Sequence, residues 1–451
     1  MKTEKDSFDL TGLERAMDAS ALSRTHLVVF LLCVILFICN GYCLQALALA
    51  VPILAAQWHV PPDAFGLALA AAVAGMGIMS LIAGSLGDRR GRRPFLILAA
   101  LMLGVGSIGS MMSTGLTSLT VWRLVTGMGL GFALPNSMAL IADFVPTRRR
   151  VVAMTLLSGA MSIGTIAAGL LAPTLLAAGG WKLLFAAGSF APIPLALIMY
   201  FWLDESPKFL AKKHGNSPAL TALLNRMSVV VPEISQAAST IGKSSAPSTT
   251  TASMRRYLPV SIAYWVQGAV AGMLMFLLMN WTPVLLLNAG ASEAESLRSV
   301  AFINGGGFVS GLILSFILDR SAKRVLLVPA GAFAFAAAAY LSAGVVADIA
   351  GFSMVALLLG FAVGPAFITI GLASRIYPSE ILATAIGASA AISSLGGVVG
   401  PLAGGWLVGR AFPIGTSMGL LAAPALLCLV SAVTLHLSSQ RFHRPIAPPV
   451  R

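Results

Sequence analysis

Polar side chains gather around a glycine in a long apolar stretch near the start of the chain. Asn40, Tyr42, Cys43 and Gln45 flank Gly41 in a segment that carries no charge. A polar atom without a hydrogen-bond partner in hydrocarbon is strongly destabilising. We therefore predict that these side chains face the interior of a helix bundle, where they can hydrogen-bond a solute.

One basic residue, Arg123, lies inside another apolar segment, and no acidic residue lies within such a segment to pair with it. The nearest acid of the same segment, Asp143, stands at its far end. An ionisable group inside a membrane is costly and marks a functional site by default. Two interpretations stay open: the side chain reaches the headgroups, or it faces a cavity and attracts an anion.

Other polar residues lie within apolar segments as further candidates for lining a solute site, with interhelical hydrogen bonds as the alternative. They are Asn136, Gln267, Asn280, Asn304 and Ser394. Trp281 is expected at the membrane interface.

No pattern of catalytic or metal-ligating residues stands out. The five histidines lie at segment ends or in loops, and the four cysteines lie in apolar segments without metal-ligand spacing. The glycine-rich runs GMGLGF and GGVVGPLAGG follow no strand, so they indicate helix packing and not phosphate binding. We expect no enzyme activity, no metal and no cofactor.

The elements that carry these residues are membrane spans. The chain of 451 residues is 57% apolar and only 10% charged, whereas soluble domains carry about 25% charged residues. A span needs ~20 mostly apolar residues. Twelve such runs occur, at 27–56, 64–87, 94–113, 118–142, 151–178, 183–203, 258–288, 299–318, 325–347, 349–374, 381–409 and 411–436.

The basic residues predict the orientation of these spans. Both termini and the loops after even-numbered spans hold 25 of the 29 lysines and arginines. Since cytoplasmic loops carry the excess of basic residues, both termini are expected in the cytoplasm, with the chain in the inner (plasma) membrane. Topology and contact with anionic lipid account for the net charge of +13 without nucleic acid.

The chain repeats itself once. The sequence GSLGDRRGRRP after the second run corresponds to SFILDRSAKRV after the eighth, which places Asp88 and Asp319 at equivalent positions. We predict an all-α membrane protein of twelve helices in two six-helix bundles. The expected divisions are a cytoplasmic tail (1–26), the first bundle (27–203), a cytoplasmic linker without hydrophobic period (204–257), the second bundle (258–436) and a second tail (437–451).

The GSLGDRRGRR motif and the run RLVTGMGLG, from Arg123 to Gly131, resemble signature motifs of the major facilitator superfamily. The resemblance covers essentially the whole chain. It implies that Asp88, Gly91 and Arg92 form a cytoplasmic gate and that Arg123 lies near the substrate or proton-coupling region. Further charged residues at helix ends, suited to ion pairs that change between states, are Asp143, Asp319 and Arg320.

Four further segments are similar to the aromatic acid:proton symporter branch: MDASALSRTHLVVFLLCVILF, LPNSMALIADFVPTRRR, NWTPVLLLNAGAS and YPSEILATAIG. That branch carries two aspartates in its first helix, where this chain has Asn40 and Cys43, and an arginine in helix eleven, where it has Ser394. An acid pair and a base inside the membrane are therefore missing together. Asn40 and Cys43 are not expected to carry protons.

The resemblance implies a secondary transporter that imports a small organic acid, an aromatic carboxylate, by alternating access. Its partners are the solute, an organic anion, and the lipid bilayer. Proton symport is the habit of the branch, but the substitutions at positions 40 and 43 leave proton-independent transport open. Two further functions stay open at this point: efflux of a drug or metabolite, and solute sensing by a membrane protein that does not transport.

Overall fold

The computed structural model describes residues 10–20, 23–215, 217–227, 258–288, 290–320 and 379–410, with isolated positions between 229 and 434. Every regular element in these ranges is a helix. Seven helices or helix pairs of the described part are long and apolar enough to cross a membrane. The ninth expected span, and most of the tenth and twelfth, lie outside the described residues.

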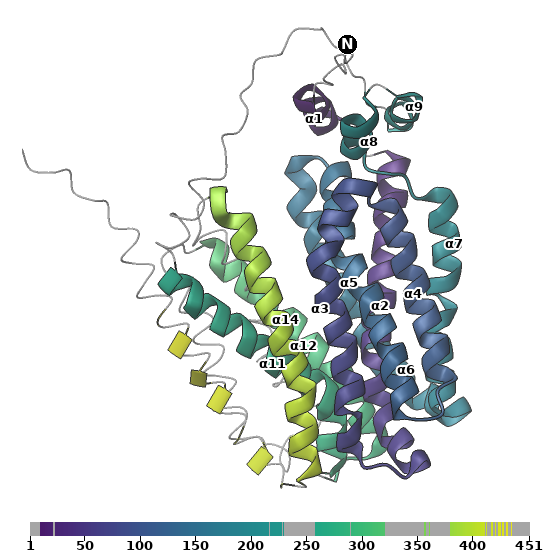
Figure 1. Cartoon of the computed structure of the whole chain (residues 1–451), viewed down its shortest axis with the longest axis vertical. Helices are drawn as coiled ribbons and strands as arrows, with labels where there is room; N and C mark the ends of the chain where they lie inside the picture. Colours follow the sequence, from purple (N-terminus) through teal and green to yellow (C-terminus); the bar gives the residue numbers. More distant parts are fainter. Residues whose placement is uncertain are drawn as a thin grey trace, which may run out of the picture.

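The spanning helices follow the predicted runs closely (Figure 1). In the first part of the chain they are α2 (Arg24–Trp58), α3 (Gly66–Arg90, preceded by the 3-10 turn η1, Pro62–Phe65), α4 (Arg93–Met111), α5 (Leu116–Phe144), α6 (Thr147–Phe190) and α7 (Pro192–Trp202). In the second part they are α11 (Leu258–Asn288), α12 (Glu293–Arg320) and α14 (Ser379–Gly409).

The break between the fifth and sixth spans falls in the expected loop, at 179–182. Helix α6 contains non-helical backbone at Gly179 and Gly180, where Gly180 has a φ of 65°. The sixth span is then divided between the end of α6 and α7, which begins at Pro192. Proline suits the first turn of a helix because its missing N–H would have no partner there.

The expected tail and linker contain helices that hydropathy did not predict. These are α1 (Leu10–Ala19), α8 (Pro207–His214) and α9 (Pro218–Arg226). Ser206 and Ser217 cap α8 and α9, and a proline follows each serine at the first helical position. Leu13 of α1 and Leu220 of α9 are fully buried, so these helices pack against the end of the bundle.

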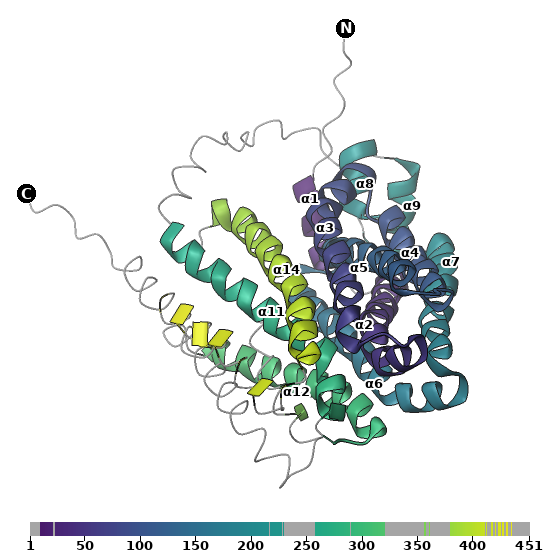
Figure 2. The same cartoon turned by 60° about the horizontal axis from the view of Figure 1, so that its bottom comes forward.

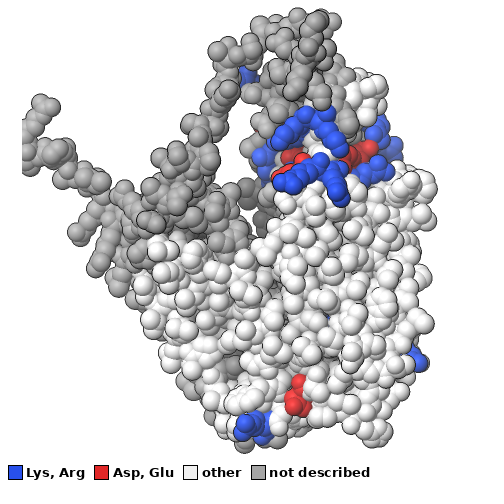
Figure 3. All heavy atoms as spheres, viewed as in Figure 1, with Lys and Arg blue, Asp and Glu red and all other residues white. Residues whose placement is uncertain are grey.

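On the face of the described part that Figure 3 shows, most charged residues gather at the end of the molecule where α1, α8 and α9 lie, and the flank below them is almost free of charge. We call this the basic end and the other the opposite end. A belt without charge between two polar ends is what a bilayer requires.

The two parts of the chain meet near the opposite end. There α3 packs on α14 and α6 packs on α12, with glycines at the points of close approach. A Cβ on Gly66 would stand 3.2 Å from the carbonyl oxygen of Pro401, and one on Gly169 would stand 2.9 Å from the backbone nitrogen of Ala301. Toward the basic end the helices separate (Figure 2), and a Cβ on Gly84 would meet nothing within 4 Å.

An apolar cluster seals the opposite end. It combines Leu54, Phe65 and Trp181 of the first part with Trp281 and Leu407 of the second. Trp281, expected at the membrane interface, is fully buried, and its indole N–H donates to the carbonyl oxygen of Pro401 (2.8 Å). The interface prediction for this residue is wrong because the tryptophan faces α14 and not lipid.

Candidate functional site

Arg123 lies inside the first bundle, between α5 and α2, with 1% of its surface exposed. Its Nη1 donates to the carbonyl oxygen of Cys43 (2.8 Å) and its Nη2 to that of Leu44 (3.1 Å), while Nε has no partner. Among the described residues no carboxylate contacts the guanidinium. Within the described part of the chain, the side chain therefore neither reaches the headgroups nor forms an ion pair, and two backbone carbonyls accept its hydrogen bonds.

Close packing of α2 on α6 brings the polar cluster of α2 to this place. A Cβ on Gly41 would stand 2.0 Å from the carbonyl oxygen of Met161, so only glycine permits the approach. The Tyr42 hydroxyl donates to the carbonyl oxygen of Leu184 (3.0 Å), which follows the break in α6.

The thiol of Cys43 takes part in the same polar cluster. It donates to the carbonyl oxygen of Gly188 (3.3 Å) and contacts the hydroxyl of Ser107 on α4 (3.6 Å). Cys43 is 1% exposed, so its side chain bonds to neighbouring helices and not to solvent. Helices α2, α4, α5 and α6 thus meet around one buried polar centre.

Gln45 has a different role from its neighbours because it connects the two parts of the chain. Its Nε2 donates to the carbonyl oxygen of Met279 on α11 (2.6 Å), and the side chain is 1% exposed. This bond lies on the side of the bundle where the apolar cluster closes.

Two amide oxygens are buried without a partner: Oδ1 of Asn40 and Oε1 of Gln267. Both side chains are nearly inaccessible, with 3% and 2% of their surface exposed. Buried amide oxygens normally accept a hydrogen bond. These two are therefore the strongest candidates to accept a hydrogen bond from a donor group on a solute.

The other predicted residues bond locally. Asn136, Asn280 and Asn304 each donate to the carbonyl oxygen four residues earlier in the same helix. Ser394 lies at the contact of α14 with α3, next to Gly77. The structure brings Asn40, Tyr42, Cys43 and Arg123 to one region, while the printed bonds of the three asparagines stay within their own helices.

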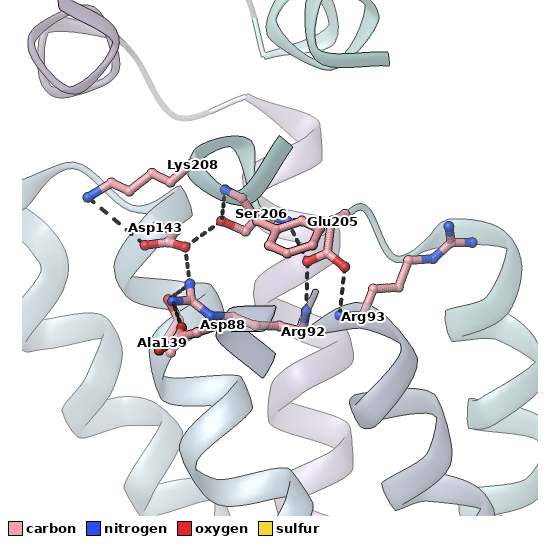
Figure 4. A network of polar contacts seen from close by, with 9 residues as sticks. Asp88, Arg92, Arg93, Ala139, Asp143, Glu205, Ser206 and Lys208 are labelled. Carbon is pink, nitrogen blue, oxygen red and sulfur yellow. Dashed lines mark hydrogen bonds and ion pairs between the residues drawn. The ribbon is translucent and has the colours of Figure 1, made fainter. Parts of the chain in front are cut away.

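The basic end carries a network of charged residues (Figure 4). The guanidinium of Arg92 donates to Asp143 and to the carbonyl oxygen of Ala139 (2.8 Å), and it lies 3.3 Å from Asp88. Asp143 also accepts from the Ser206 hydroxyl, and Lys208 Nζ lies 4.0 Å away. Arg92 thus joins the α3–α4 turn to the end of α5.

Glu205 completes the network, although the sequence did not single it out. Its two carboxylate oxygens accept from the backbone N–H groups of Arg92 (2.9 Å) and Arg93 (3.2 Å), at the N-terminus of α4. Helix N-termini favour negative charge at this position. The available signal was the sequence Asp-Glu-Ser-Pro after the sixth span, an acid next to a helix-capping serine.

Gly91 allows the turn that holds this network. Its φ is 97°, a conformation that other residues rarely adopt, and a Cβ there would stand 2.2 Å from a carboxylate oxygen of Glu205. The side chains of Asp319 and Arg320, expected to form the equivalent site at the end of α12, lie outside the described residues.

Comparison with known proteins agrees with this architecture. The family model of the Major Facilitator Superfamily matches residues 33–373. The chain belongs to the major facilitator superfamily. The expected fold of twelve transmembrane helices in two six-helix bundles is thereby confirmed, and members of this family are transporters, not enzymes.

Two solved structures of this superfamily resemble the chain. The bacterial homologue of the human lysosomal transporter Spinster, in an inward-facing and unoccupied conformation, superimposes with a TM-score of 0.70 at 16% identity, covering 95% of this chain and 99% of that one. The D-xylose–proton symporter gives a TM-score of 0.67 at 17% identity, covering 91% and 97%. At these identities the likeness concerns the fold alone.

Curated relatives within the superfamily match over almost their whole length. The 4-hydroxybenzoate transporter PcaK of Acinetobacter baylyi is 29% identical, with 94% of this chain and 93% of the relative covered. The gallate transporter of Pseudomonas putida is 26% identical, with 91% of each chain covered. The 3-(3-hydroxy-phenyl)propionate transporter of Escherichia coli is 29% identical, with 94% and 97% covered.

Proposed function

We propose that this chain is a secondary transporter that carries a small aromatic carboxylate inward across a bacterial inner membrane. Three relatives, covered over more than nine-tenths of their length, are named for transport of a hydroxybenzoate, a gallate and a hydroxyphenylpropionate. All three names denote a carboxylate attached to an aromatic ring, so the relatives support a substrate of the same class.

The observation that carries the proposal is the guanidinium of Arg123. A fully buried cation with no carboxylate beside it in the described part of the chain creates a positive potential inside the first bundle. Its Nη1 and Nη2 are directed at the carbonyls of α2, and its Nε–H has no partner. Such a potential attracts an anionic solute.

Alternating access is the mechanism that the packing supports. The halves touch near the opposite end and separate toward the basic end, which the positive-inside rule assigns to the cytoplasm. We assign this arrangement to the inward-facing state, with both termini in the cytoplasm. Movement of one six-helix bundle (27–203) against the other (258–436) would open the opposite end and close the basic end.

The network at the basic end is the proposed cytoplasmic gate. Arg92 and Asp143 are held together within the first bundle, and Asp88, which pairs with the same guanidinium, has 67% of its side chain exposed. Closure of the basic end would bring the second bundle over Asp88 and give its carboxylate a partner there in addition to Arg92.

Uptake by purified protein in proteoliposomes tests the proposal. We expect saturable uptake of labelled 4-hydroxybenzoate, competed by other aromatic carboxylates but not by 4-hydroxybenzamide, which has the same ring and no charge. The amide comparison uses the wild-type protein, so it does not depend on the folding of a variant. Equal competition by the amide would refute recognition of the carboxylate.

A variant at Arg123 tests the assigned cation. Arg123→Met removes the charge and keeps an unbranched side chain, and it should lower carboxylate uptake by at least about tenfold, the loss expected for one buried charged contact. Asn136→Leu is the matched control, because Asn136 lies on the same helix and donates to the carbonyl oxygen of Phe132 on that helix. Equal loss in both variants would show a structural effect and contradict the assignment.

A further inference from the structure

We propose that this transporter moves its aromatic carboxylate without a coupled proton, as an electrogenic anion carrier. The inference rests on the proposed function and concerns the same buried centre. A proton-coupled carrier needs a group in its membrane interior that takes up and releases a proton near neutral pH during each cycle.

No carboxylate is available for this role within the spans. All 16 acidic residues of the sequence lie in tails, loops or at the ends of the twelve apolar runs. In the described part, the acid of the first bundle nearest to Arg123 along its own helix is Asp143, twenty residues away, or about 30 Å along α5. Asp143 lies at the basic end, where it contacts Arg92, Lys208 and Ser206.

The partner of Arg123 cannot titrate either. The guanidinium is held by the backbone carbonyl oxygens of Cys43 and Leu44, and a peptide carbonyl does not bind a proton at any physiological pH. An arginine paired with a carboxylate would let that carboxylate exchange a proton for the substrate, whereas an arginine paired with carbonyls has a constant charge.

The remaining groups around this centre are neutral across the physiological range. Helix α2 contributes the thiols of Cys39 and Cys43 and the hydroxyl of Tyr42, whose ordinary pKa values lie above 8. Helix α4 contributes the Ser107 hydroxyl, and α6 contributes the backbone carbonyls of Leu184 and Gly188. The two histidines of the α2 region, at positions 26 and 59, stand about 24 Å or more along the helix from Cys43.

This arrangement has a consequence for the reaction that follows transport. One carboxylate anion crosses per cycle with no compensating proton, so an inside-negative membrane potential opposes uptake. Net import then depends on an intracellular reaction that consumes the aromatic acid and keeps its concentration low. The carrier is expected to feed such an enzyme, and it cannot concentrate the acid by itself.

Proteoliposomes with separate potassium and proton gradients distinguish the two mechanisms. With valinomycin and a potassium gradient of about tenfold directed inward, an anion carrier should accumulate 4-hydroxybenzoate about tenfold, while a one-proton symporter is electroneutral and should not respond. With potassium equal on both sides and an outside pH lower by about one unit, the symporter should accumulate about tenfold and the anion carrier should show no accumulation.

The controls and outcomes separate this inference from the proposed function. Protein-free liposomes correct for diffusion of the undissociated acid, and sodium-free buffers exclude sodium coupling. Uptake that follows the potassium gradient alone supports the inference. Uptake that follows the proton gradient or requires sodium overturns it and leaves the proposed function intact, and no uptake under any condition refutes the proposed function itself.

A gain-of-function variant adds a test within the same centre. Cys43→Asp places a carboxylate on the α2 face that carries the carbonyls bound by Arg123. We expect uptake by this variant to become dependent on the proton gradient. If uptake by the wild-type protein already depends on the proton gradient, and uptake by Cys43→Asp depends on it to the same extent, the inference is contradicted.

Discussion

The hydrogen bond between Gln45 and the carbonyl oxygen of Met279 should stabilise the state in which the opposite end is closed. This side-chain hydrogen bond joins α2 of the first bundle to α11 of the second. It must break when the two bundles separate there. Gln45→Leu removes the donor while keeping a similar volume, so the apolar packing around it is largely preserved.

The size of the effect follows from the value of one buried hydrogen bond. Such bonds contribute about 0.6 kcal/mol on average inside membrane proteins and up to about 1.5 kcal/mol in general. Losing this free energy multiplies the equilibrium constant between the two states by about 3 to 13, in favour of the state open at the opposite end.

Distances between spin labels at the opposite end measure this equilibrium. Met112, at the end of α4, and Arg410, after α14, are exposed and belong to different bundles, so they suit labelling through introduced cysteines. A Cys428→Ala background removes one native thiol, and the other three cysteines are buried. In Gln45→Leu the population with the longer distance should increase by the stated factor.

Gln57 provides the matched control on the same helix. It accepts a hydrogen bond from the indole of Trp181 (2.7 Å), entirely within the first bundle. Gln57→Leu should therefore leave the distance distribution unchanged, even if it lowers the free energy of unfolding. An equal shift in both variants, or no shift in Gln45→Leu, would refute the role of Gln45 as a contact between the bundles.

Three further predictions concern stability and are measured by thermal unfolding in detergent. Glu205→Gln should destabilise the N-terminus of α4 by about 1 kcal/mol, because the amide loses the charge that the two N–H groups favour; an unchanged unfolding temperature would contradict this. Gly41→Ala should prevent the approach of α2 to α6 and cost about 1–3 kcal/mol, whereas Gly84→Ala, in open space, should be tolerated; similar effects would argue against the packing. Hydrogen bonds from Ser292 lower the pKa of the exposed Glu295 carboxyl in the folded protein. The stability that the ionised carboxylate contributes is therefore present above the ordinary carboxyl pKa, and it is lost as the pH falls through the lowered pKa of the folded protein. The difference in unfolding temperature between wild type and Glu295→Gln should therefore close at acid pH, and a constant difference would be inconsistent with it.

Much of the fold could be predicted from the sequence because burial in lipid is a property of each segment by itself. A run of about 20 apolar residues transfers favourably whatever its neighbours are, and the described spanning helices cover the runs that hydropathy selected. Short helices such as α8 and α9 escaped prediction because only a few of their residues are buried, by contact with the end of the bundle.

The candidate site was predictable in composition but not in its contacts. The isolated charge of Arg123 and the polar cluster from Asn40 to Gln45 were evident from the sequence, since polar residues are rare in spans. Their partners were not, because the carbonyls of Cys43 and Leu44 and that of Met279 are backbone groups. Any residue type can supply a carbonyl, so no sequence pattern indicates it.

The sequence by itself determined the membrane class, the internal repeat, the bias of basic residues to one side and the absence of any acid within the spans. These follow from the transfer free energies of single residues and their order along the chain. Only the tertiary structure decided that α2 approaches α6 at Gly41, that Arg123 bonds to helix carbonyls and that Gln45 crosses between the two bundles. Such contacts depend on the crossing and rotation of helices that are distant in sequence, which local hydropathy does not encode.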